Sequence, residues 1–255
     1  MKSWQTTILG LTLMLLVAAS GAAQTIDPVL GDSQDQVVTG KATVAPAAPS
    51  RLQALAVRTD AIFLVWQDNS NNESAFRIEM STGGGAFVEI GTTPANTLGV
   101  FINGLAPSTT YTFRVRASND VGNSAYSNQA SATTRTSDAP CAPSATEMCL
   151  NNNRFRVQAL FQTTGTSSGQ AHAVKLTVDS GYLWFFNEAN IEAVVKVLDG
   201  CGVNSRYWFF AGGLTNVRVV LAVTDTQTQT TRVYMNPINT AFQPIQDTGA
   251  FNTCP

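Results

Sequence analysis

The chain is poor in charge, in histidine and in cysteine. Charged residues make up 13% of its 255 positions, whereas an average soluble domain has about 25%. The 15 basic side chains do not outnumber the 17 acidic ones, so no basic excess can neutralise phosphates, which argues against a nucleic-acid binder. One His and four Cys argue against a His-rich metal site. Apolar residues, at 44%, argue against a chain disordered throughout.

Residues 1–23 have the pattern of a secretory signal peptide. Lys2 supplies the positive start, residues 8–19 are apolar, and residues 20–23 are small, so cleavage is expected before Gln24. The alternative is a membrane anchor, but the apolar run is shorter than the ~20 residues that a spanning helix needs. We therefore predict a protein secreted to the periplasm or the extracellular space, with no membrane insertion after cleavage.

All four cysteines lie in the C-terminal half, at Cys141, Cys149, Cys201 and Cys254. An even number in an oxidising compartment predicts two disulfides, for which three pairings are possible. We favour Cys141–Cys149, which closes a short loop, and Cys201–Cys254, which ties the end of the chain to the middle of its domain. Zinc is disfavoured because the sequence has no Cys-x-x-Cys pair and no His cluster.

The first half of the mature chain divides into a lead-in and a strand-rich domain. Residues 24–45 have few large apolar residues and no clear period, which predicts a flexible lead-in. Residues 46–136 instead contain short segments of alternating apolar and polar side chains, separated by turn signals. Tyr111, Phe113 and Val115, for example, share one face of such a segment. This spacing predicts a β-sandwich.

Five motifs within residues 46–136 resemble a bacterial fibronectin type III domain. They are Pro49-Ser50-x-Leu52, Leu64-Val-Trp66-Gln-Asp68-Asn-Ser70, Phe76-Arg-Ile78-Glu79, Gly104-Leu105-Ala-Pro107-Ser-Thr-Thr-Tyr111 and Ser124-Ala-Tyr126-Ser-Asn128. The resemblance implies an immunoglobulin-like sandwich of seven strands in two sheets, with Trp66 as its buried tryptophan and Leu105 and Tyr111 in its tyrosine corner. It also implies a role as a spacer or binding surface. Residues 120–123 lack the Arg-Gly-Asp that some members use for cell adhesion.

Residues 137–255 predict a second, disulfide-bonded β-sandwich, reached through a joint that contains Pro and Ala. The stretch 141–255 resembles an uncharacterised β-rich module that recurs in exported bacterial proteins, which implies architecture but no activity. Residues 188–198 are ambiguous, because their apolar positions suit a helix whereas their β-branched residues suit a strand. We predict a strand there, with a helix as the alternative.

Two segments of this second domain, 181–186 and 206–210, are aromatic on both faces. A sandwich strand normally buries only one face, so a loop of the same domain, the first domain, another subunit or a ligand must cover the other. Cover from within the domain is one interpretation. The other is a binding surface, for which the candidates are Tyr182, Trp184, Tyr207 and Trp208.

Groups able to do chemistry are scarce. His172 is the only usual base and has no Gly-x-Ser-x-Gly elbow to serve, so we predict a surface or edge-strand histidine. Glu188 and Glu192 would lie too far apart on a strand for glycoside hydrolysis. Residues 68–79 imitate a calcium loop only faintly, because Glu73 stands where glycine is needed. No catalytic residue, cofactor or metal is therefore expected.

Taken together, the sequence predicts an all-β protein with two β-sandwich domains in tandem, the first of them immunoglobulin-like. Its predicted function is that of an exported, non-catalytic binding or structural protein in extracellular protein–protein or matrix-type interaction. The alternative is a carbohydrate-binding module that uses exposed aromatic side chains of the C-terminal domain. The expected partner is an extracellular protein or glycan, and not a nucleic acid.

Overall fold

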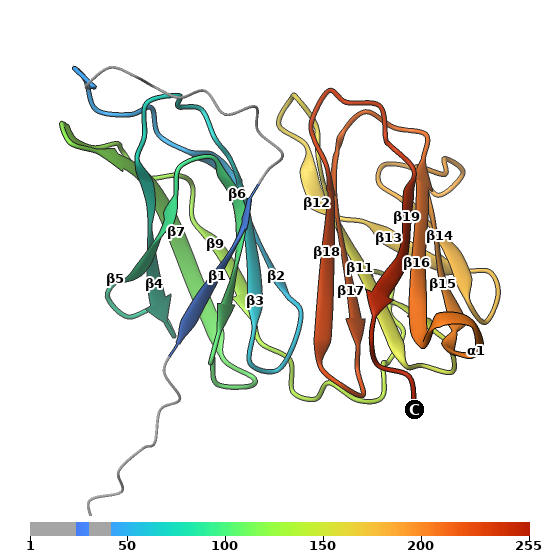
Figure 1. The fold of residues 1–255 in the computed structure, drawn as a ribbon. Helices are drawn as coiled ribbons and strands as arrows, with labels where there is room; N and C mark the ends of the chain where they lie inside the picture. Colours follow the sequence, from blue (N-terminus) through green and yellow to red (C-terminus); the bar gives the residue numbers. More distant parts are fainter. Residues whose placement is uncertain (1–23, 31–41) are drawn as a thin grey trace, which may run out of the picture.

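A computed structural model describes residues 24–30 and 42–255, and it shows two β-sandwiches packed side by side (Figure 1). The fold class is all-β, as predicted, and the described residues contain one short helix, α1 (Cys201–Asn204). No helix within the described ranges is long and apolar enough to cross a membrane. The predicted signal peptide, residues 1–23, lies outside the described residues.

The first sandwich pairs a sheet of order β1-β6-β3-β2 with a sheet of order β5-β4-β7-β8, in which β9 also pairs with β7. Trp66, Phe76 and Phe113 are fully buried between the sheets, because alternation along β3, β4 and β7 sends their side chains to the same side. The strands are β1 (Thr25–Leu30), β2 (Ser50–Ala56), β3 (Ile62–Gln67), β4 (Ala75–Thr82), β5 (Val88–Pro94), β6 (Thr97–Asn103), β7 (Thr110–Asn119), β8 (Gly122–Asn123) and β9 (Ala130–Thr133).

Strand β1 corrects the prediction that residues 24–45 are a flexible lead-in. It adds to the free edge of β6 as an antiparallel strand. Ile26 packs against the core, and Gly91 makes room for it: a Cβ at Gly91 would lie 2.5 Å from Ile26 Cδ1. The new edge carries Asp27 and Pro28, residue types that discourage further strand pairing. The lead-in therefore contains the edge strand of the first sandwich.

The tyrosine corner forms as the resemblance implies. The backbone N–H of Ala106 donates to the hydroxyl of Tyr111 at 3.0 Å. Leu105 and Tyr111 are both buried. This hydrogen bond fixes the loop between β6 and β7 against the strand that follows it.

The second sandwich pairs a sheet of order β10-β11-β17-β18, with β12 on β11, against a sheet of order β13-β14-β15-β16-β19. Phe155, Phe209 and Phe251 fill its core. Residues 193–198 lie in strand β15, as predicted for most of 188–198, whereas residues 188–192 form the turn before it. The strands are β10 (Met148–Leu150), β11 (Phe155–Gln162), β12 (Ser168–Gln170), β13 (His172–Lys175), β14 (Ser180–Trp184), β15 (Ala193–Gly200), β16 (Arg206–Gly213), β17 (Arg218–Asp225), β18 (Thr230–Asn236) and β19 (Ile245–Phe251).

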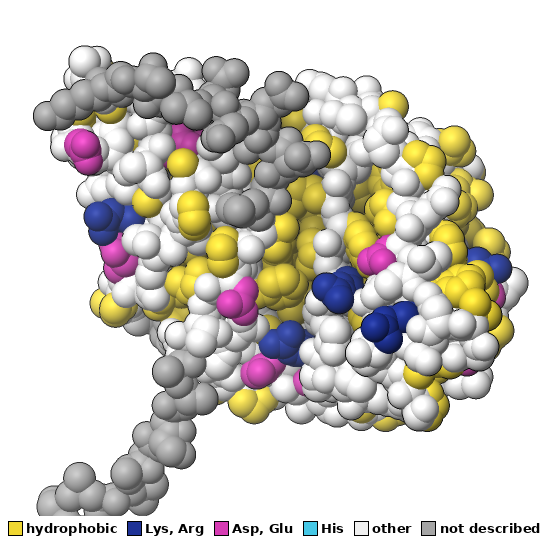
Figure 2. Space-filling view, in the orientation of Figure 1, with side chains coloured by type: hydrophobic (Ala, Val, Ile, Leu, Met, Phe, Trp, Pro, Cys, Tyr) yellow, Lys and Arg dark blue, Asp and Glu magenta, His cyan; other side chains and the backbone are white. Residues whose placement is uncertain are grey.

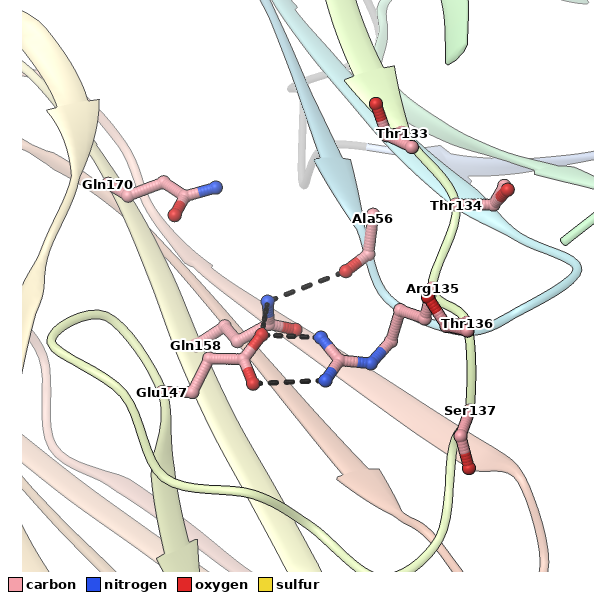
Figure 3. A pocket seen from close by; sticks show the side chains of 9 residues that line it. All are labelled: Ala56, Thr133, Thr134, Arg135, Thr136, Ser137, Glu147, Gln158 and Gln170. Atoms are coloured by element: carbon pink, nitrogen blue, oxygen red, sulfur yellow. Dashed lines mark hydrogen bonds and ion pairs between the residues drawn. The ribbon is translucent and has the colours of Figure 1, made fainter. Parts of the chain in front are cut away.

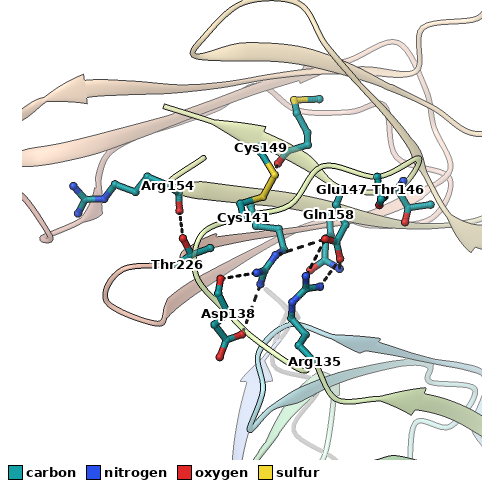
Figure 4. Close-up of a disulfide and its surroundings, with 12 residues drawn as sticks. Arg135, Asp138, Cys141, Thr146, Glu147, Cys149, Arg154, Gln158 and Thr226 are labelled. Atoms are coloured by element: carbon teal, nitrogen blue, oxygen red, sulfur yellow. Dashed lines mark hydrogen bonds and ion pairs between the residues drawn. A yellow bond between two sulfur atoms is a disulfide. The ribbon is translucent and has the colours of Figure 1, made fainter. Parts of the chain in front are cut away.

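Two disulfides crosslink the second sandwich, and their pairing is the one favoured in the sequence analysis. Cys141–Cys149 closes a loop of sequence separation 8 beside the joint between the sandwiches (Figure 4). Cys201–Cys254 spans a sequence separation of 53 and ties the C-terminal tail to α1. The first bridge therefore anchors the start of this sandwich, and the second anchors its end.

The two sandwiches pack face to face through the sheet that contains β2 and β3 and the sheet that contains β11 and β17 (Figure 1). Hydrophobic side chains gather in the furrow between them (Figure 2). Side chains that point outward from both sheets form one buried hydrophobic cluster. They are Leu55, Val57, Ala61, Phe63, Val65, Leu160, Val220 and Ala222.

Polar side chains of the second sandwich surround this cluster and are buried with it. Arg156 is 1% exposed and donates to the carbonyl oxygens of Val57, at 3.2 Å, and Asp138, at 2.8 Å. Gln158 donates to the carbonyl oxygen of Ala56. In the sequence these residues alternate with core residues and look solvated, so the domain interface was not predictable from their pattern.

Candidate functional site

Alternation along β13 to β16 leaves an outward set of side chains that neither sandwich covers completely. We call this set the aromatic face, and its members share the outer side of the sheet β13-β14-β15-β16-β19. The pairing register places Val174, Tyr182 and Val194 in one row across three strands. The members are His172, Val174, Tyr182, Trp184, Val194, Trp208 and Phe210.

Three of the four predicted surface residues lie on the aromatic face, and one does not. Tyr182, Trp184 and Trp208 are half-exposed there. Tyr207 was wrongly included, since it is only 6% exposed and points into the core. Its hydroxyl accepts a hydrogen bond from Arg154 Nη1 at 3.0 Å. Because β16 is apolar on both sides, its sequence could not show which side faces inward.

Trp208 is held in one orientation. Its ring lies against Gly200, where an added Cβ would come within 2.4 Å of the indole. Its Nε1–H donates to Asn204 Oδ1 at 2.7 Å. Asn204 ends α1, the short helix that the Cys201–Cys254 bridge anchors. The half-exposed indole therefore loses little conformational freedom when a ligand contacts it.

His172 and Trp184 form the second fixed element of the face. The two residues are paired across β13 and β14. Their rings stack with centroids 3.8 Å apart and planes 7° apart. His172 lies on an edge strand, as predicted, and no hydrogen bond to its imidazole is found within the described ranges. Its observed role is therefore packing against Trp184.

An open depression of about 380 Å³ lies on the same face. Leu176, Val194 and Phe210 contribute apolar walls, and Gly212 leaves its floor without a side chain. Lys196 also lines the depression, and its Nζ lies 3.6 Å from Asp179 Oδ2. The depression is suited to an apolar group that projects from a partner.

The hydrogen bond from Thr177 is the main reason that the pKa of Asp179 lies below its ordinary value, and Lys196 lowers this pKa further. The Thr177 hydroxyl donates to Asp179 Oδ1 at 2.6 Å. The Asp179 side chain is therefore a carboxylate at neutral pH.

The outer face of the first sandwich differs, because its charges satisfy one another. Arg114 Nε donates to Glu79 at 2.8 Å, and the Tyr126 hydroxyl donates to Glu79 at 2.6 Å. The Arg114 guanidinium also lies 3.9 Å from the centre of the Tyr126 ring. Burial opposes ionisation of Glu79, but Tyr126 and Arg114 outweigh it and the pKa of Glu79 is lowered. This network offers few unsatisfied groups to a partner.

A polar pocket of about 390 Å³ lies between the sandwiches (Figure 3). Arg135 pairs with Glu147 across the joint, and Gln158 donates to Glu147 at 3.0 Å. The two charges in this pocket neutralise each other, so the pair serves to join the sandwiches.

The two glutamates considered for catalysis are separated in environment. Glu188 is exposed in the turn before β15, whereas Glu192 is 6% exposed and accepts a hydrogen bond from Asn190. Neither is a member of the aromatic face.

The carboxyl group of Asp68 has a raised pKa. Burial is the main cause that raises the pKa of its carboxyl from 3.8 to about 6; a hydrogen bond from the Ser70 N–H lowers this pKa, and the neighbouring Glu73 raises it. The folded state therefore binds this proton more tightly than the unfolded state does. Stability is expected to fall as the pH rises through the window from 3.8 to about 6.

The variant Asp68→Asn tests this pH dependence. It removes the charge, so we expect it to be more stable than the wild type by about 1 kcal/mol above pH 7, after screening of a half-exposed group is allowed for. Below the unfolded pKa the two proteins are expected to be equally stable. Thermal unfolding followed by circular dichroism across this range measures the difference, with the exposed Asp120→Asn as the control. An equal gain at all pH values would contradict the assignment.

Comparison with known proteins identifies the first sandwich. Residues 47–133 match the family model for the fibronectin type III domain, so this part of the chain is such a domain. Among curated proteins, none matches this chain. The resemblance stated for residues 141–255 stays a prediction.

Several solved structures are similar to this domain. One is a fibronectin-III-like protein from Clostridium thermocellum, with 24% identity over 34% of this chain and 92% of the other, at a TM-score of 0.30. Another is the sixth fibronectin type III domain of human fibronectin type III domain containing protein 3, with 24% identity over 40% and 98% and a TM-score of 0.34. A titin fragment shares 23% identity over 36% of this chain, at a TM-score of 0.33, and the match spans only 32% of the fragment.

Proposed function

We propose that this protein is an exported, non-catalytic binding or structural protein, and that its aromatic face contacts an extracellular protein or matrix. The observation that carries the proposal is that the fixed, half-exposed Trp208, the half-exposed Tyr182 and an apolar depression share one side of the same sheet. Fixed aromatic side chains that can be desolvated supply most of the energy at many protein interfaces. Fibronectin type III domains generally take part in protein–protein interaction or serve structural roles, which agrees with this proposal.

The arrangement of the sandwiches supports the same choice of surface. One sheet of each sandwich is covered by the other. Of the two remaining outer faces, that of the first sandwich holds charges that already satisfy one another. On the aromatic face Val194 is 48% exposed, and Leu176, which lines the depression there, is 62% exposed. Exposed apolar area of this kind marks contact surfaces.

Carbohydrate binding is the second candidate, and the fixed orientation of Trp208 favours it. An indole that is held in one orientation can stack on a sugar ring without losing further rotamer freedom. The stacked pair His172–Trp184 provides a second flat group on the same face. Sugar binding therefore requires the same residues as protein binding, and only the ligand distinguishes the two.

The double variant Tyr182→Ser/Trp208→Ser tests the surface. We expect it to lose at least about tenfold in affinity for the natural partner, because two aromatic anchors are removed. The immobilised protein and the variant are exposed to the extracellular fraction of the producing cells and, separately, to insoluble polysaccharides. Proteins or polysaccharides retained by the wild type alone identify the ligand class.

The control for this experiment is Val88→Ser, because Val88 is 63% exposed on the first sandwich, away from the aromatic face. It should bind as the wild type does. Equal retention by the wild type and the double variant would show that the aromatic face is not the contact surface.

A further inference from the structure

Arg218 carries a buried charge without a carboxylate partner in the part of the chain that the structure describes. It is 4% exposed and lies at the junction of the two sandwiches. Its guanidinium donates only to neutral oxygens, those of the Trp66 carbonyl, the Gln162 side chain and the Gln67 side chain, at 2.8 to 3.0 Å. Its Nε has no hydrogen-bond partner. A buried charge without a counter-ion destabilises the folded state.

A second arginine, Arg51, increases this excess of positive charge. Burial is the main cause that lowers the pKa of Arg218 to about 10, and the charge of Arg51 lowers it further. The ion pairs of the described residues include neither arginine. Arg156 differs, since Asp138 and Glu147 lie within 4.0 Å of it. The excess is therefore confined to the end of the junction where Arg51 and Arg218 lie.

Arg51 reaches from the first sandwich to the second. Its guanidinium donates to the carbonyl oxygens of Thr163 and Thr164, in the loop between β11 and β12. A guanidinium has five N–H donors, so donors remain after these two bonds. The backbone of Arg51 has φ of 56°, a left-handed conformation that is uncommon for a residue with a Cβ. The side chain is thus set across the junction by an unusual turn of β2.

These groups border a pocket of about 310 Å³ to which both sandwiches contribute. Arg51, Leu52 and Asn128 line it from the first sandwich, and Gln162 and residues 165–168 line it from the second. Gln162 also accepts the hydrogen bond from Arg218. The hydroxyl groups of Thr166, Ser167 and Ser168 make no hydrogen bond to the described residues, so they are available to a ligand. The pocket thus combines a positive charge with hydroxyl donors and no carboxylate.

We propose that this pocket binds a small oxyanion, which is a sulfate, a phosphate or a carboxylate, between the guanidinium of Arg51 and the hydroxyl groups of residues 166–168. The anion offsets the repulsion between Arg51 and Arg218 and links the two sandwiches. This site is separate from the aromatic face and does not depend on the function proposed for it. The oxyanion can be a free inorganic ion or a charged group on an acidic polysaccharide.

Titration of the mature chain with sodium sulfate, at ionic strength held constant with sodium chloride, tests the proposal. We expect the amide signals of residues 165–168 to shift in two-dimensional NMR spectra, and Tm to rise with sulfate. Arg51→Gln should raise the Kd for sulfate by about tenfold or more, because it removes charge-assisted hydrogen bonds. Parallel titrations with acetate and with polyuronate oligosaccharides show whether the oxyanion is taken free or from a polysaccharide.

Arg232→Gln is the matched control, because Arg232 also lacks a carboxylate partner among the described residues but donates to Ala250 away from the pocket. It should keep the sulfate response, including any general stabilisation by this salt. Localised shifts at residues 165–168 with any of the anions, lost in Arg51→Gln, support the site. No localised shift with any of them, or shifts that persist in Arg51→Gln, would overturn it.

Discussion

Replacing Cys201 and Cys254 by serine is expected to lower the free energy of unfolding of the second sandwich by about 4 kcal/mol. The bridge joins residues separated by 53 positions, so its loss frees a long loop in the unfolded chain. The matched control is the double serine variant of Cys141 and Cys149. Its bridge spans a separation of 8, so about 2.5 kcal/mol is expected. Urea unfolding of both variants measures the difference.

The same substitution is expected to loosen the aromatic face. Cys201 begins α1, and Asn204 at its end holds the indole of Trp208. Once the bridge is broken, the helix is no longer tied to the C-terminal tail, so Trp208 should gain motion that time-resolved fluorescence anisotropy detects. The chain contains four Trp, and Trp208→Phe in each background isolates the signal of this indole. An equal loss of stability in both cysteine variants, with Trp208 unchanged, would contradict this coupling.

The architecture could be predicted from the sequence because a half-buried strand imposes a period of two. That period identified most strands of both sandwiches, including the larger part of 188–198, where the β-branched residues outweighed helical spacing. Strand β19 was missed because Gln246, Asp247, Thr248 and Gly249 interrupt its apolar residues. Strand β1 was missed because a short edge strand with Asp27 and Pro28 lacks the usual signal.

The surfaces were harder to predict, because alternation shows that a strand has two faces but not what covers each. On β16 both faces are apolar, and Tyr207 was assigned to the wrong one. On β11 the polar residues Arg156 and Gln158 alternate with core residues, yet they are buried against the first sandwich and bonded to its carbonyl oxygens. Long polar side chains can satisfy their hydrogen bonds inside a domain interface as well as in water. Their pattern alone therefore cannot distinguish a wet face from a buried one.

The second large effect is expected at this domain interface. Val220 is 1% exposed, and it is paired with Leu160 within the cluster that both sandwiches share. The substitution Val220→Asp would place an unpaired carboxylate there, at a cost of about 3 to 5 kcal/mol. The least costly response is for the sandwiches to separate, because each has its own core and the new charge can then reach water.

We therefore expect Val220→Asp to separate the two sandwiches while leaving both folded. Small-angle X-ray scattering should show a larger radius of gyration, and calorimetry should resolve two transitions where the wild type shows one. Val203→Asp is the control, since Val203 is 77% exposed on α1 and a charge there remains in solvent. An unchanged radius with a single transition would mean that the interface tolerates the charge. Separation would instead show that Leu55, Phe63 and Val220 set the arrangement of the sandwiches and thus the direction in which the aromatic face points.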